Sequence, residues 1–225
     1  MNILLTGGSG DLGTELKKIL SNCTSPIKQE LDVTNRKQVF DFFQKNSIDL
    51  VIHTAAITNI RLCEENRKLA WDTNVQGTRN LVDAIKKSEN NTKFIYISTA
   101  CVFDGHGGMY KESDIPYPEN FYALTKILFK KTMSYYQKIY QKKIFLNLFI
   151  GDTYGSNDNR KKILPMIIKN YKKNKNTKIL TRKLYLNILH VKDIINAIKI
   201  LIDKEKKSKN YYIKPKKKLN LFNVI

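Results

Sequence analysis

The sequence predicts an α/β protein built around a doubly wound parallel sheet, and two observations lead to this prediction. Short apolar segments of strand length alternate with longer segments in which apolar residues recur every three or four positions. The short segments are apolar at successive positions, which is typical of strands covered on both faces of a sheet. Because strands that alternate with helices form right-handed βαβ units, we expect the strands to lie parallel.

The predicted strands are apolar runs such as Ile3-Leu4-Leu5 and Leu50-Val51-Ile52. The second strand of the series is short and weak. In chain order, strands are expected at Asn2–Thr6, Pro26–Gln29, Leu50–Ile52, Lys93–Ser98, Ile144–Ile150, Lys178–Leu180 and Leu186–His190.

The predicted helices carry apolar residues three and four positions apart, as Leu12, Leu16 and Ile19 do. This spacing predicts helices at Leu12–Leu20, Thr34–Lys45, Thr73–Lys87, Tyr122–Gln141, Lys162–Lys173 and Val191–Ile202. Towards the C-terminus the pattern is less regular, with a charged loop expected at Lys204–Lys209 and the start of a helix at Leu219–Ile225. We therefore predict a main domain at 1–155 and a small lobe at 156–225 that interleaves with the main sheet.

Composition fits one α/β domain with a small appendage. Of the 225 residues, 42% are hydrophobic, which is enough for a core. Three cysteines, without a Cys-x-x-Cys pair, indicate free thiols in a reducing cytoplasm, and with three scattered histidines they give no metal site. No apolar run reaches about 18 residues, so no membrane span is expected. The N-terminus does not read as a secretory signal.

The net charge of +20 allows two interpretations. A basic chain can bind an anionic partner such as nucleic acid, a membrane surface or a phosphorylated substrate. A composition rich in Lys, Asn and Ile produces the same charge without any partner. We favour composition, because the lysines are dispersed and no aromatic–Arg recognition pattern occurs. No specific nucleic acid is expected, although the positive field would still attract a nucleotide diphosphate.

A glycine-rich loop follows the first predicted strand and leads into the first predicted helix. Gly7, Gly10 and Gly13 stand three residues apart in it. Glycine permits a tight turn, close approach of a pyrophosphate and close packing of the helix on the strand. The helix N-terminus adds free amide groups and a positive dipole end. The loop therefore predicts dinucleotide binding on a Rossmann-type sheet.

The loop Thr6–Gly13 resembles the TGxxGxxG fingerprint of the extended short-chain dehydrogenases/reductases, the NAD-dependent epimerase/dehydratase superfamily. Leu31-Asp32-Val33-Thr34 and the segments Phe94–Gly105 and Pro118–Lys126 are similar to dTDP-4-dehydrorhamnose reductases in particular. The resemblance covers almost the entire chain and is strongest over 1–155. Family members usually continue well beyond the end of this chain, so we expect a partial, truncated C-terminal substrate lobe.

The resemblance implies the cofactor-binding residues. Asp32 would bond the adenine amino group; alternatively, it is an ordinary helix-start residue beside Thr34 as the N-cap. Asn74 would anchor the active-site backbone, or serve as a structural helix residue. Lys28 lies where family members usually carry an acidic residue for a ribose hydroxyl, so NADP is favoured over NAD. The full set is Gly7, Gly10, Asp11, Leu12, Gly13, Asp32, Val33, Ala55, Ala56, Asn74, Tyr122 and Lys126.

Tyr122 and Lys126 form one of three Tyr-x-x-x-Lys pairs, the others being Tyr171/Lys175 and Tyr212/Lys216. Only the first pair opens a long helix and follows a predicted strand, Lys93–Ser98, whose end is expected to place Thr99 at the carboxyl edge of the sheet. Its side chains share one helix face. A nearby ammonium and the nicotinamide charge favour phenolate, so they lower the phenol pKa from about 10. Tyr122 would then be the proton donor, Thr99 would bond the reacting oxygen, and Lys126 would hold the ribose hydroxyls.

The resemblance implies an NAD(P)-dependent oxidoreductase acting on a nucleotide-activated sugar. The first expectation is reduction of a 4-keto-6-deoxysugar nucleotide. Reductases of this type usually carry Asp after the threonine, whereas Ala100 is common in epimerases, so a sugar-nucleotide 4-epimerase with bound NAD is the alternative. A non-catalytic, nucleotide-binding regulatory subunit is a third. Relatives often dimerise through the catalytic helix and its neighbour, so a homodimer is possible.

Overall fold

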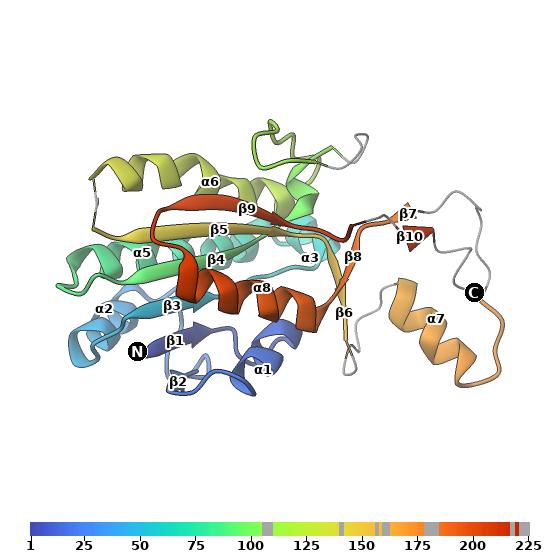
Figure 1. Cartoon of the computed structure of the whole chain (residues 1–225), viewed down its shortest axis with the longest axis horizontal. Coiled ribbons are helices and arrows are strands. Elements are labelled where there is room, and N and C mark those ends of the chain that lie inside the picture. The colour runs from blue at the N-terminus through green and yellow to red at the C-terminus, as the bar shows by residue number, and fades with distance from the viewer. Residues whose placement is uncertain are drawn as a thin grey trace.

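The centre of the molecule is a six-stranded sheet in which every adjacent pair of strands is parallel (Figure 1). The structure, a computed structural model, describes residues 1–104, 110–139, 142–155, 158, 163–177, 185–216 and 219–220. The strand order is β2-β1-β3-β4-β5-β9. The order runs outward from β1 in both directions, which confirms the predicted doubly wound sheet. The strands are β1 (Ile3–Thr6), β2 (Cys23–Thr24), β3 (Leu50–His53), β4 (Lys93–Thr99), β5 (Ile144–Ile150) and β9 (Lys209–Ile213).

Helices cover both faces of this sheet (Figure 1). On one face, Ile3 and Leu5 pack in a core with α1 (Asp11–Lys17) and α8 (Val191–Lys204). On the other, Leu4 belongs to a core shared with three further helices, α2 (Arg36–Lys45), α5 (Gly77–Lys87) and α6 (Phe121–Ile139). Since neighbouring residues of β1 face opposite layers and both are buried, the strand has to be apolar throughout.

Two strand predictions differ from the structure. Strand β2 lies at Cys23–Thr24 and not at Pro26–Gln29. Proline at position 26 has no N–H to donate to a ladder, and β1 pairs with β2 only through Ile3 and Leu4. The strand expected at Leu186–His190 is divided into β7 (Tyr185–Leu186) and β8 (Ile188–His190). The strand predicted at Lys178–Leu180 lies outside the described residues.

The strand β9 begins at Lys209, the last residue of the charged loop expected at Lys204–Lys209, and the sequence did not predict it. As an edge strand it pairs only with β5, and lysines flank its short apolar run. The helix expected to start at Leu219 is wrong there, because Leu219–Asn220 forms β10, which pairs antiparallel with β7. Short strands held by pairing with distant segments leave a weak periodic signal in the sequence.

Two short helices between β3 and α5 lack a prediction, α3 (Ile60–Glu65) and α4 (Arg67–Trp71). The helix predicted at Thr73–Lys87 begins as the π-helix η1 (Asp72–Gln76) and continues as α5. Asn59 and Asn66 begin α3 and α4, and each side-chain oxygen accepts a backbone N–H three residues later. These helices are too short for apolar periodicity to show, so their caps are the stronger signal.

Two lysines at the amino edge of the sheet close helix C-termini. Lys93, which begins β4, donates to the carbonyls of Leu201, Ile202 and Glu205 at the end of α8. Lys143, just before β5, donates in the same way to the carbonyls of Ile85, Ser88 and Asn90, at and just after the end of α5. Burial is the first cause that lowers the pKa of both ammonium groups. Part of the positive charge of the chain is therefore structural.

Residues beyond 155 contribute to both the main sheet and a smaller region. Strand β9 completes the six-stranded sheet, whereas β8 pairs with β6 (Asp152–Tyr154) and the helix α7 (Ile163–Tyr171) projects to one side (Figure 1). The division into 1–155 and 156–225 stays a prediction. Among the described helices, none is long and apolar enough to cross a membrane. The described side chains include no metal-binding group of three or more His, Cys, Asp or Glu residues.

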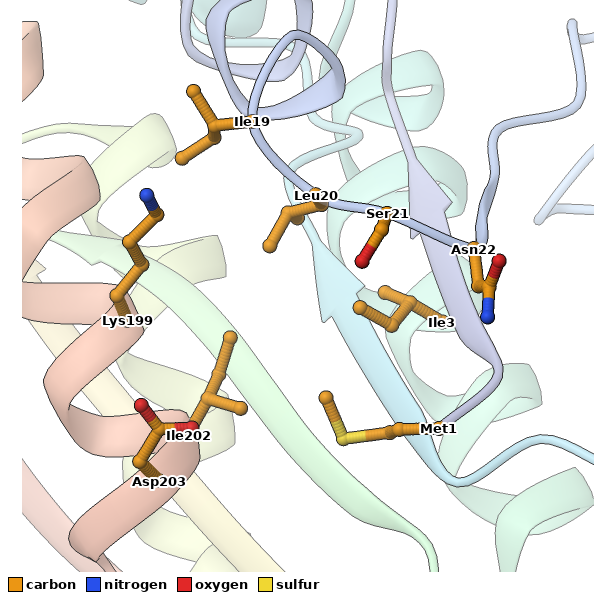
Figure 2. Close-up of a pocket in the computed structure, with 9 residues that line it drawn as sticks. All are labelled: Met1, Ile3, Ile19, Leu20, Ser21, Asn22, Lys199, Ile202 and Asp203. Carbon is orange, nitrogen blue, oxygen red and sulfur yellow. The ribbon is translucent and has the colours of Figure 1, made fainter.

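A cavity lies at the amino edge of the sheet, between the end of α1 and the helix α8. Ile3 begins β1 on one side of it, and Lys199 and Asp203 line the other (Figure 2). None of the predicted cofactor or catalytic residues lines this cavity. They gather at the opposite, carboxyl edge of the sheet.

Candidate active site

The glycine loop is shaped by contacts with the segment that follows β3. Gly7 has a φ of +77°, and a Cβ there would lie 2.5 Å from the Ala55 nitrogen. A Cβ on Gly13 would lie 2.3 Å from the Gly7 oxygen. Both positions therefore require glycine for the protein's own packing.

Gly10 differs from the other two glycines. A Cβ there would meet only the Gly7 oxygen, at 3.4 Å, which is ordinary contact. Packing leaves the space above Gly10 open, at the point where α1 begins. Asp11 and Leu12 follow in the first turn of α1. The loop thus fits a bound pyrophosphate, and the cofactor roles of its residues remain predictions.

The segment after β3 is hydrogen-bonded to the start of the glycine loop. Thr54 Oγ1 donates to the carbonyls of Thr6, at 2.7 Å, and Gly7, at 3.1 Å. Ala55 and Ala56 follow, both half-buried. Their small side chains leave this part of the sheet edge open, as a cofactor lying against the backbone would need.

Asp32 and Val33 lie in the segment that connects β2 to α2. The Asp32 carboxylate accepts hydrogen bonds from the Thr34 backbone, at 2.9 Å, and hydroxyl, at 2.8 Å. Burial alone would raise the Asp32 pKa, but these bonds and Lys28 lower it. Val33 is buried against Gly77. The expectation that Thr34 caps the following helix is wrong: Asn35 is the N-cap of α2, and its side chain accepts from Gln38.

Asn74 lies in the π-helix η1 and is 1% exposed. Its side-chain oxygen accepts from the Ile57 nitrogen at 2.8 Å, and its amide donates to the Ile57 oxygen and to Thr125 Oγ1, each at 3.0 Å. These bonds tie the segment after β3 to α6. All of them are internal to the protein, and its contact with a cofactor stays a prediction.

Thr99, Tyr122 and Lys126 meet at the carboxyl edge of the sheet. Thr99 is the last residue of β4; its hydroxyl oxygen accepts the Cys101 N–H at 3.2 Å, and its side chain lies near enough to the Tyr122 hydroxyl to lower the pKa of that group. Tyr122 and Lys126 lie one turn apart near the start of α6 and are 8% and 3% exposed. The Lys126 Nζ lies 4.0 Å from the centre of the Tyr96 ring. The structure therefore brings the three predicted catalytic residues together.

The protonation of this site differs from expectation. Burial, followed by the nearby Cys101, raises the Tyr122 pKa, and the Thr99 side chain only partly opposes this. Burial lowers the pKa of Lys126 to about 7. The predicted lowering of the phenol pKa by Lys126 is thus not found: burial dominates, and Lys126 is not among the groups that shift the Tyr122 pKa. At neutral pH Tyr122 is a protonated phenol, the form that donates a proton.

The other two Tyr–Lys pairs lack this setting. Tyr171 ends α7 and is 81% exposed. Tyr212 is buried, but it lies on the extended strand β9, and Lys216 lies beyond the end of that strand, so the pair does not share a helix face. Sequence reasoning missed Glu64, whose carboxylate accepts the Phe121 N–H at 2.6 Å and so fixes the start of α6. No local pattern could reveal a partner that lies 57 residues away.

Comparisons with known proteins agree with this geometry. The sequence profile of the NAD dependent epimerase/dehydratase family matches residues 3–213. A dTDP-4-dehydrorhamnose reductase of Aggregatibacter actinomycetemcomitans is 34% identical over 130 residues, which is 55% of this chain and 44% of that protein. A CDP-abequose synthase of Yersinia pseudotuberculosis is 28% identical over 218 residues, covering 91% of this chain and 74% of the relative.

A solved structure of a dTDP-4-dehydrorhamnose reductase from Bacillus anthracis, in complex with NADP, superposes with a TM-score of 0.82. It is 25% identical, and the match covers 100% of this chain and 78% of that one. The chain spans about half the length of several curated relatives it matches. Because the family profile matches nearly the whole of this chain, the chain belongs to the NAD dependent epimerase/dehydratase family, which confirms the predicted family and its nicotinamide dinucleotide cofactor.

Proposed function

We propose that the chain is an NAD(P)-dependent oxidoreductase that reduces the 4-keto group of a nucleotide-activated 4-keto-6-deoxysugar. The observation that carries the proposal is the buried Tyr122 side chain, which lies beside Thr99 at the end of β4 and one helical turn from Lys126. The site lies at the same sheet edge as the glycine loop. Membership of the family and the two sugar-nucleotide relatives support the substrate class.

In this proposal the bound dinucleotide supplies the hydride. Tyr122, protonated at neutral pH, gives its hydroxyl proton to the carbonyl oxygen of the sugar. Thr99 orients that oxygen by a hydrogen bond. Lys126 holds the ribose hydroxyls and places a positive charge beside the phenolate left on Tyr122. Burial of all three excludes water from the proton transfer.

A sugar-nucleotide 4-epimerase is the second candidate, and one residue favours it. Ala100 follows Thr99 in the position where the reductases usually carry aspartate. The same Tyr122 would then remove a proton and return it, with oxidised dinucleotide retained. Dinucleotide that stays bound through purification would support this candidate. Dinucleotide that exchanges freely would support the reductase.

The direct test is incubation with a panel of nucleotide-activated 4-keto-6-deoxysugars and either NADH or NADPH. Loss of nicotinamide absorbance that depends on the sugar is the expected result. Binding of dinucleotide without turnover on any sugar of the panel, and without epimerisation of nucleotide sugars, would instead point to a regulatory subunit. Absence of dinucleotide binding would refute the role of the glycine loop.

The preference for NADP rests on Lys28. Its ammonium is largely exposed and lies 3.6 Å from the Asp32 carboxylate. Because β2 ends earlier than expected, at Thr24, Lys28 lies four residues beyond the strand. We expect Lys28→Ala to weaken NADPH binding and to leave NADH binding within about twofold. Equal losses for both dinucleotides would remove this argument for NADP.

A homodimer through α6 is part of the proposal. Leu124, Tyr135 and Ile139 are exposed apolar residues of this helix. Light scattering coupled to gel filtration measures the molar mass, which for a dimer would be about twice the 26.1 kDa of one chain. A monomer at micromolar concentration would contradict it.

A further inference from the structure

A chain of buried hydrogen bonds runs beneath the carboxyl edge of the sheet, with His53 at its centre. His53 ends β3 and is 1% exposed. Its Nδ1 lies 2.7 Å from Thr6 Oγ1, and its Nε2 lies 3.0 Å from Thr78 Oγ1. Thr6 directly precedes Gly7, and Thr78 lies in the first turn of α5.

The partners of His53 determine its tautomer. Thr78 has one hydroxyl proton, and it donates that proton to the Asn74 carbonyl at 2.7 Å, which can only accept. The Thr78 oxygen must then accept from His53, so Nε2 carries the proton. Nδ1, without a proton, accepts from Thr6. The imidazole is neutral, because burial and then the Lys126 charge lower its pKa to about 3.

The chain continues from Asn74 to the catalytic helix. The Asn74 side-chain amide donates a hydrogen bond to Thr125 Oγ1 at 3.0 Å, and the Thr125 hydroxyl donates a hydrogen bond to the Tyr122 carbonyl at 2.7 Å. Thr125 is 1% exposed, so this end of the hydrogen-bond chain is as buried as His53. Direct hydrogen bonds thus connect the residue before Gly7 with the backbone of Tyr122.

We propose that His53 is a positioning residue, which as the neutral Nε2–H tautomer couples the glycine loop to the Tyr122 turn of α6. The coupling rests on the proposed function, because the dinucleotide loop and the proton donor are its two ends. A neutral imidazole suits this place. A charged one would repel Lys126, and an apolar side chain would leave the Thr6 hydroxyl without its acceptor.

Thr78→Val tests the coupling, because it removes one link and keeps the side-chain shape. Thr92→Val is the matched control: Thr92 is also buried and also donates to a backbone carbonyl, that of Ile48 at 2.8 Å, but at the amino edge of the sheet. We expect both variants to lose similar thermal stability. Only Thr78→Val should raise the Kd for NADPH, by about fivefold or more, and lower kcat at least tenfold with the sugar KM within about twofold. Thr78→Ser, which keeps the hydroxyl, should restore both.

The tautomer has its own test, which needs no activity. In the variant His106→Gln/His190→Asn, His53 is the only histidine, and a long-range ¹H–¹⁵N spectrum reports which ring nitrogen carries the proton. We expect the Nε2–H form. An Nδ1–H form or a charged ring would overturn the proposed chain of bonds. So would a Thr78→Val variant that binds NADPH and turns over like Thr92→Val.

Failure of the proposed function would look different. If the unmodified protein binds no dinucleotide, the proposed function and the coupling both fail, although the spectrum would still show the Nε2–H form. If it binds dinucleotide and turns over, but Thr78→Val has no effect beyond that of Thr92→Val, only the coupling fails.

Discussion

Replacing Gly10 by alanine tests whether the open space above this residue is used by a ligand, because the protein's own packing does not fill it. The Gly10 backbone has φ −75° and ψ 168°, which alanine adopts without strain. Alanine reduces the entropy of the unfolded chain, a gain of about 0.4–1 kcal/mol. It is also a poorer N-cap than glycine for α1, by about 0.5–1 kcal/mol. Because the two effects nearly cancel, the free energy of unfolding should change by less than about 0.5 kcal/mol.

Gly13→Ala is the contrasting variant in the same loop. Its Cβ would lie 2.3 Å from the Gly7 oxygen and 2.7 Å from the Gly8 Cα, so backbone has to move. Such overpacking costs about 1–3 kcal/mol, and each kcal/mol lowers Tm by about 2–4 °C in a chain of this size. We therefore expect Gly13→Ala to lower Tm clearly and Gly10→Ala to leave it within about 2 °C.

The assay combines thermal unfolding with a fluorescence titration of NADPH. A methyl group above Gly10 should occupy the space proposed for the pyrophosphate, so the Kd should rise at least about tenfold, or about 1.4 kcal/mol. A Gly10→Ala variant that is stable and binds NADPH as tightly as the unmodified protein would refute the assignment of that space.

Two further predictions concern lysines. Because burial lowers the Lys126 pKa to about 7, the folded protein releases a proton that the unfolded chain keeps up to about pH 10. This contribution makes stability rise with pH between about 7 and 10, by up to about 1.4 kcal/mol per unit; in Lys126→Met, urea unfolding at pH 7 and 9 should show that rise removed. Lys143→Met leaves the carbonyls of Ile85, Ser88 and Asn90, at and just after the end of α5, without their donor, which should cost about 1–3 kcal/mol and lower Tm without changing the Kd for NADPH. An unchanged Tm would show that water replaces the lysine.

The parts of the fold that the sequence predicts well are those with continuous local patterns. A local sequence pattern of about ten residues is enough to identify the apolar strand β1, the long helix α6 and the glycine loop. The Tyr-x-x-x-Lys spacing occurs three times in the sequence, so the spacing alone does not identify a site. Tyr122/Lys126 is chosen over the other two pairs because Thr99 precedes it at the end of a strand.

The parts that escaped prediction depend on distant partners. Strand β9 forms because β5 offers a free edge, and its burial comes from Tyr212 packing on Phe103 and Phe149. His53 reads in the sequence as the end of an apolar strand, and its two threonine partners lie 47 and 25 residues away. The Tyr122 pKa was mispredicted for a related reason: the spacing shows Lys126, but not how deeply both side chains are buried.

The central claim, that Tyr122 is the proton donor, is tested most directly by Tyr122→Phe. This change keeps the ring that packs with Cys63 and Ala70 and removes only the hydroxyl near Thr99. Tyr136→Phe, on the same helix, is the control. We predict that Tyr122→Phe lowers kcat by at least about 100-fold, while its Kd for NADPH stays within about twofold. A Tyr122→Phe enzyme that reduces its sugar nucleotide at the rate of Tyr136→Phe would contradict the account.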